Sequence, residues 1–161
     1  MDQNSAIIGT VMALFFIGPI LYMILKQQNK NKKRLKDLEN ICSNNQMKPN
    51  EIELSNSLML GLDSSSKKLI IVEPKNNMQY DIIDLSKINA SHIAKKGPSV
   101  NGDKNPSTIT HLSLELSKFN GKEKVTEIVF YDEDDDSSDN YDTQLFIANK
   151  WDRLIKSNLS A

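Results

Sequence analysis

Residues 110–132, THLSLELSKFNGKEKVTEIVFYD, alternate between apolar and polar side chains on both sides of an Asn-Gly pair. Successive side chains of a β-strand point to opposite faces, so Leu112, Leu114 and Leu116 share one face. Asn-Gly is the dipeptide that two-residue hairpin turns favour. The stretch therefore predicts an antiparallel hairpin with one apolar face, and further elements must cover that face.

The period changes after the hairpin and the acidic run that follows it. Leu145, Trp151, Leu154 and Ile155 recur at helical spacing within a helix predicted from about residue 141 to residue 158. Trp151 is the only tryptophan of the chain. We expect these four side chains to anchor the helix against the sheet.

Strand-like segments also precede the hairpin. They are short apolar runs separated by turn residues, over residues 58–63, 68–73, 79–85 and 88–95. Residues 51–161 are thus predicted to form one α+β domain, expected to fold independently of what precedes Lys48. Its core is an antiparallel sheet or partly open β-barrel of about six strands, closed by the C-terminal amphipathic helix.

This order of elements resembles the pleckstrin-homology-like superfold, in which a bent sheet or partly open barrel is plugged at one corner by a final helix. The resemblance covers residues 55–158, and one of the superfold's usual seven strands is not recognised. It rests on the opening hairpin 58–72, the strand 79–85, the hairpin 112–130 and the helix that carries Trp151.

The resemblance implies one candidate binding loop. In lipid-binding members of the superfold, cations in the first hairpin loop hold a phosphorylated headgroup. The equivalent residues here are Lys67 and Lys68, a candidate headgroup or partner loop. Lysine lacks the planar fork with which arginine grips phosphate, and a solvated turn is the alternative.

An uncharged run of twenty residues, Ala6–Leu25 (AIIGTVMALFFIGPILYMIL), lies near the start of the chain. At ~1.5 Å per residue, a helix of this length spans about 30 Å, the thickness of a bilayer's hydrocarbon core. The run predicts a single transmembrane helix over residues 6–25 after a short extracytoplasmic N-terminus, residues 1–5. A cleaved signal peptide is the alternative, but the run lacks the basic n-region and small-residue cleavage site of such peptides.

A basic segment follows the run at once, with six cations between Lys26 and Lys36 and none before the run except the amino terminus. This bias predicts a single-pass membrane protein with its N-terminus outside and its C-terminal domain cytoplasmic. Residues 26–50 are predicted to form a polybasic juxtamembrane helix and linker. The candidate contacts for anionic lipid are Lys30, Lys32, Lys33, Arg34 and Lys36.

Catalytic and metal-binding patterns are not recognisable. His92 and His111 are the only histidines, Cys42 lies outside the predicted domain, and no phosphate loop or nucleophile motif occurs. The acidic run 132–139 lacks the glycine and the glutamate that a calcium loop requires. We therefore expect no enzyme, no cofactor and no metal site.

Charge also argues against a nucleic-acid partner. Residues 51–161 carry 13 Lys/Arg and 18 Asp/Glu, a formal net charge of −5. The basic segment has no interleaved aromatic residues, and the domain beyond it is acidic.

Two functions remain. The first is a membrane-anchored, non-enzymatic interaction or adaptor domain that recruits a protein partner to the cytoplasmic face of a membrane. The alternative is a small accessory subunit of a larger membrane complex, assembled through its transmembrane helix. In that helix Ala6, Gly9, Thr10 and Ala13 form a stripe of small residues that would let another helix approach closely.

Overall fold

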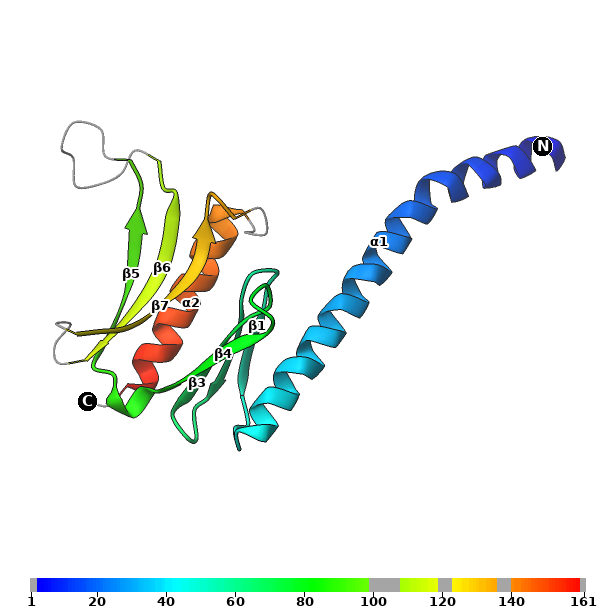
Figure 1. The fold of residues 1–161 in the computed structure, drawn as a ribbon. Coiled ribbons are helices and arrows are strands. Elements are labelled where there is room, and N and C mark those ends of the chain that lie inside the picture. Colours follow the sequence, from blue (N-terminus) through cyan, green and yellow to red (C-terminus); the bar gives the residue numbers. More distant parts are fainter. Residues whose placement is uncertain (1–2, 99–107, 119–122, 136–139, 160–161) are drawn as a thin grey trace. The chain divides into compact units, whose positions relative to one another are not determined.

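The computed structural model describes residues 3–98, 108–118, 123–135 and 140–159, without the side chains of residues 3–11, 123 and 125. Contacts divide the chain into two units, Met1–Asp37 and Leu38–Ala161. Figure 1 shows the elements of each unit. The predicted turn at residues 120–122, part of the predicted loop 96–107 and part of the acidic run lie outside the described residues.

Helix α1 runs from Gln3 to Asn44 and contains Pro19. The chain therefore stays helical through the basic segment that follows the apolar run. The helix ends where Gln46 adopts a positive φ of 58°, and the Met47 amide donates to the Cys42 carbonyl at 2.9 Å. This backbone reversal satisfies carbonyls of the last turn and stops the helix.

The structure contradicts the predicted membrane span. Within the described part of the chain, no helix has the length and apolar character needed to cross a membrane.

The predicted transmembrane helix 6–25 is therefore wrong on this finding. The single-pass location, the orientation with a cytoplasmic C-terminal domain, and the membrane as an integral partner all depended on that helix, so they are corrected with it. Of the predicted stripe of small residues, Ala6, Gly9 and Thr10 lie outside the part of the chain whose side chains are described.

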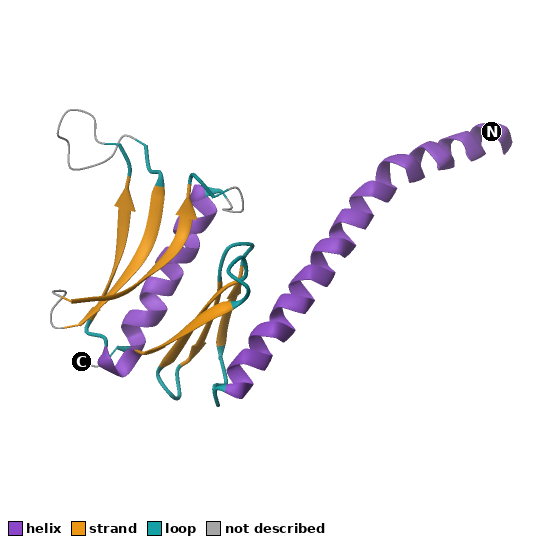
Figure 2. Ribbon diagram, viewed as in Figure 1, coloured by secondary structure: helices purple, strands orange, loops and turns teal. Residues whose placement is uncertain are grey.

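The second unit begins with a four-stranded antiparallel sheet. Its strand order is β1-β2-β3-β4, and Figure 2 shows its strands in orange. The strands are β1 Glu51–Leu54, β2 Met59–Asp63, β3 Lys68–Glu73 and β4 Gln79–Asp84. Strand β1 is the one that the sequence did not reveal, and its four residues are all half-buried.

A three-stranded antiparallel sheet follows, with the order β5-β6-β7. It contains β5 Ala90–Lys96, β6 His111–Lys118 and β7 Glu123–Asp132. A short 3-10 helix, η1 Leu85–Lys87, connects β4 to β5. Leu114 of β6 lies opposite Ile128 of β7, and the β6–β7 register shifts twice along the pair.

Helix α2, Tyr141–Asn158, packs with both sheets around one core. Leu112, Leu114 and Leu116 of β6 are fully buried in that core, as is Trp151 of α2. The prediction of one sheet or barrel of about six strands is therefore wrong: the described residues form seven strands in two sheets. The chain turns through η1 after β4, so β4 and β5 belong to different sheets.

The other face of the first sheet has its own apolar cluster. Leu38 and Cys42 of α1 are buried there with Met59, Ile70 and Val72. Gly61 permits this close packing, because a Cβ on Gly61 would lie 2.9 Å from Ile70 Cγ2. We call the second unit, Leu38–Ala161, the compact unit. The last turns of α1 thus belong to its core and not to a linker.

Candidate functional site

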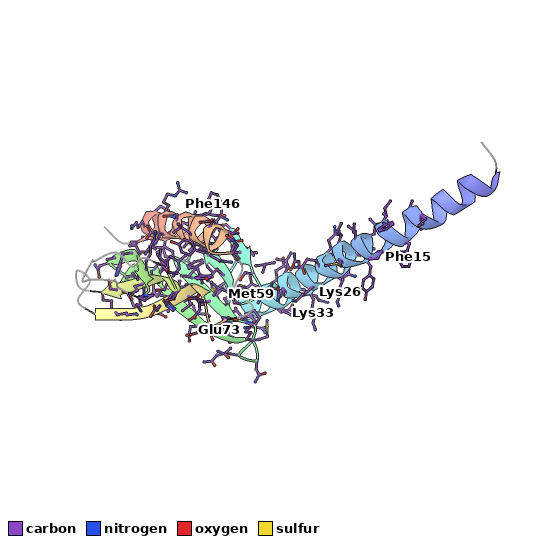
Figure 3. All side chains as sticks on the ribbon, turned by 90° about the horizontal axis from the view of Figure 1, so that it is seen from above. Phe15, Lys26, Lys33, Met59, Glu73 and Phe146 are labelled. Atoms are coloured by element: carbon purple, nitrogen blue, oxygen red, sulfur yellow. The ribbon has the colours of Figure 1, made fainter. Side chains whose placement is uncertain are left out.

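The five basic residues predicted to contact lipid lie on the middle of helix α1. Four of them, Lys30, Lys32, Lys33 and Lys36, are exposed, and Arg34 is half-buried; Figure 3 labels Lys33 on this helix. Residues three and four apart share a helix face, so Arg34 lies with Lys30 and Lys32 lies with Lys36, and Lys33 neighbours both Lys30 and Lys36. The structure thus distributes these charges around the helix and does not gather them on one face.

Lys67 is the last residue of the turn between β2 and β3, and Lys68 is the first residue of β3; both are half-buried. Lys67 has a positive φ of 52°, and its carbonyl accepts a 2.8 Å hydrogen bond from the Leu85 amide. Neither lysine lines the cavity described next. Their geometry is that of a turn tied by its backbone to η1.

The compact unit contains a cavity of about 250 Å³ between its two sheets. Buried residues form its apolar floor: Leu58, which precedes β2, Ile71 of β3, and Ile128 and Phe130 of β7. Its lining residues come from strands and turns, and none from α2. The remaining lining residues are Ser57, Glu73, Lys75, Asn76, Glu127, Val129 and Asp135.

Charged side chains stand at the rim of this cavity. Lys75, in the β3–β4 turn, forms an ion pair with Asp135, which follows β7. Asn76 donates its side-chain amide to the carboxylate of Glu73. The ion pair therefore connects the β3–β4 turn of the first sheet to the segment that follows β7 of the second sheet.

A second polar cluster covers the outer face of the three-stranded sheet and is centred on Glu127. The Glu127 carboxylate accepts hydrogen bonds from Lys124 Nζ at 2.5 Å and Ser113 Oγ at 2.6 Å. Lys96 Nζ donates to it at 3.2 Å, and His111 Nε2 lies 3.0 Å away. These donors, Lys124 foremost, hold the pKa of Glu127 well below its ordinary value.

Glu115 extends the cluster along strand β6. Its carboxylate pairs with Lys124 at 3.0 Å and lies 3.0 Å from His92. The hydrogen bond from Lys124 lowers the pKa of Glu115 as well. The two carboxylates are thus held ionised by neighbouring cations, and a general acid or base needs a pKa near the working pH instead.

The two clusters define what the described residues offer chemically. In the parts of the chain that the structure describes, no group of three or more His, Cys, Asp or Glu side chains is arranged to hold a metal ion. The outer face of the three-stranded sheet is occupied by paired charges. The cavity, with its apolar floor and charged rim, is the better candidate binding site.

The sequence pointed only indirectly to this site. Lys75 and its partner Asp135 are 60 positions apart in the chain, so no local pattern predicts their pairing. Only the pairing of the two sheets brings the β3–β4 turn beside the segment that follows β7.

Comparison with known proteins adds no relative: no family model, no characterised protein and no solved structure matches this chain. The fold and the geometry of its surfaces are therefore the basis for a functional proposal.

Replacing Glu127 by glutamine should make stability less dependent on acid pH. The folded-state pKa of Glu127 lies below its unfolded value of ~4.3. Its ionised form therefore stabilises the fold above that pH, and this contribution is lost as pH falls through the lower, folded-state pKa. Glu127→Gln should cost on the order of 1 kcal/mol at pH 7, because the partly exposed cluster is screened by water.

Urea unfolding followed by circular dichroism at pH 7 and pH 3 measures this difference. The difference in free energy of unfolding between the wild type and the variant should be smaller at pH 3 than at pH 7. Glu133→Gln is the control, since Glu133 is exposed. A difference of equal size at both pH values would show that the charge of Glu127 contributes nothing.

Proposed function

We propose that this chain is a non-enzymatic interaction protein, which joins a protein assembly through helix α1 and presents its compact unit as an adaptor domain. One observation carries the proposal. Every large apolar side chain that the structure describes between Met12 and Leu25 is exposed, from 47% for Ile24 to 78% for Phe15.

A surface of this kind calls for a covering partner. Monomeric proteins rarely keep contiguous apolar patches larger than a few hundred Å², and larger patches mark interaction sites. Apolar side chains surround the helix here, including the neighbouring Phe15 and Phe16 and the later Tyr22. An apolar groove or helix of a partner protein is the surface that fits such a segment.

The compact unit supports the adaptor part of the proposal. We infer a pleckstrin-homology-like arrangement from four strands, then three strands, then one helix that packs on the core. A fold-level likeness says little about function, because one fold supports many functions. What it contributes is a self-contained scaffold with exposed loops and strand edges, suited to displaying a binding surface.

An accessory subunit is the second candidate, and the same apolar segment favours it. In that case helix α1 makes the only interface, and the compact unit recruits nothing. The two candidates differ in whether a partner protein contacts the compact unit.

Site-specific photo-crosslinking in the cells that express the protein tests both. A benzophenone amino acid at Phe15 should give a protein adduct under either candidate. The same probe at Val129, beside the cavity, should give an adduct only for an adaptor; Glu39 is the exposed control position. A folded protein without any protein adduct from Phe15 would contradict the proposed function.

A further inference from the structure

The cavity between the sheets has the size of a site for one side chain. At about 250 Å³, it is smaller than the ~300–1,000 Å³ of typical small-molecule sites. Its floor is aliphatic and aromatic, formed by Leu58, Ile71, Ile128 and Phe130. A long side chain with an apolar stem would match such a floor.

The charged side chains at the rim of the cavity determine which charge the end of that side chain should carry. Lys75 is paired with Asp135, whereas the described contact of Glu73 is with the neutral amide of Asn76. Glu127 also lines the cavity, but its carboxylate pairs with Lys96 and Lys124. Glu73 is therefore the rim carboxylate whose described contact includes no cation, and it is exposed to solvent. In Figure 3 Glu73 projects from the opposite side of the compact unit to Phe146.

Strand β7 offers a way to hold the rest of such a ligand. It is an edge strand, since the described part of the sheet pairs it with β6 alone. Ile128, Val129 and Phe130 of this strand line the cavity. An extended peptide that pairs with a free strand edge gains affinity from main-chain hydrogen bonds and specificity from pockets for its side chains.

We propose that the cavity and the adjoining edge of β7 form a docking site for an extended segment of a partner protein, which inserts one arginine or lysine side chain. The stem lies on the apolar floor, and its cationic end pairs with Glu73. The overall acidity of residues 51–161, with 13 Lys/Arg against 18 Asp/Glu, favours the approach of a basic segment. This site is separate from the apolar surface of α1, so either proposal can fail without the other.

A peptide-binding experiment with the full chain tests this site. The probe is a fluorescein-labelled peptide, Thr-Val-Thr-Arg-Thr-Val-Thr, and its binding is followed by fluorescence anisotropy. Two matched peptides carry norleucine or glutamate in place of the arginine. The arginine peptide should bind at least tenfold more tightly than either of them.

A charge swap identifies the residue responsible. Glu73→Lys should weaken the arginine peptide at least tenfold and should strengthen binding of the glutamate peptide, a gain that a misfolded variant would not show. Glu39→Lys makes the same charge change at an exposed position of α1 away from the cavity and should leave all three affinities unchanged. Equal binding of the three peptides, no binding of any, or no effect of Glu73→Lys would overturn the proposal.

Discussion

Replacing Trp151 by alanine is expected to lower the free energy of unfolding by about 3–5 kcal/mol. Trp151 is 0% exposed and lies in the core that both sheets share with α2. Removing the indole leaves a cavity that the two sheets cannot close, because each is held by its own strand pairing. The loss would be a large part of the ~5–15 kcal/mol that keeps a typical domain folded.

The indole also has a polar contact. Its Nε1 donates to a carboxylate oxygen of Glu53 at 3.4 Å, and Lys150 pairs with the same oxygen at 3.2 Å. Glu53 lies on β1, so the bond links α2 to the first sheet. Trp151→Phe should therefore cost less than Trp151→Ala, since it retains most of the apolar volume.

Urea unfolding followed by circular dichroism measures these losses. Phe146→Ala is the matched control on the same helix, because Phe146 is 68% exposed and surface substitutions usually change stability by less than ~0.5 kcal/mol. In the wild type, tryptophan emission should be blue-shifted and protected from quenchers. Red, readily quenched emission would contradict the buried position and identify Trp151 as a surface residue.

Removing residues 1–47 is expected to destabilise the compact unit by roughly 3–6 kcal/mol, at about 1.5–3 kcal/mol for each of the two large apolar side chains, Leu38 and Met47, that are lost from the core. Leu38, Cys42 and Met47 are all at most 2% exposed and cover the first sheet. Without them, Met59 and Ile70 would face water. The fragment 48–161 should then aggregate or unfold at low urea, unlike the independent fold expected from sequence.

A fragment of residues 34–161 is the control, because it keeps the last turns of α1. It should unfold cooperatively and at higher urea than the shorter fragment, as measured by circular dichroism. Leu38→Ala in the full chain should reproduce part of the loss, about 2–5 kcal/mol. Equal stability of the two fragments would show that the end of α1 adds nothing to the fold.

Asp63 explains how the chain is held after helix α1 ends. The Lys48 amide donates to its carboxylate at 2.9 Å, and the amides of Ser65 and Ser66 donate at 3.0 and 3.1 Å. These bonds, that of Lys48 foremost, lower the pKa of Asp63. One carboxylate therefore fixes both the exit from α1 and the β2–β3 turn.

Local periodicity determined the hairpin and the closing helix. The alternation of Leu112, Leu114 and Leu116 and the helical spacing of Trp151 and Ile155 are properties of short segments, and these five side chains are buried in the structure. Strand β1 was missed because its four residues, EIEL, follow a polar segment and are too few to establish a period. Strand β1 forms because its backbone pairs with β2, a contact that its own four residues do not predict.

The division into two sheets and the placing of the functional surfaces were decided by tertiary structure. Lys75 meets Asp135 across 60 positions of sequence, and Lys96 meets Glu127 across 31. The burial of Leu38 depends on which face of the first sheet is left uncovered by α2. A sequence pattern shows which face of each segment is apolar. Which of these faces pack against one another depends on the packing free energy of the whole chain, which no single segment determines.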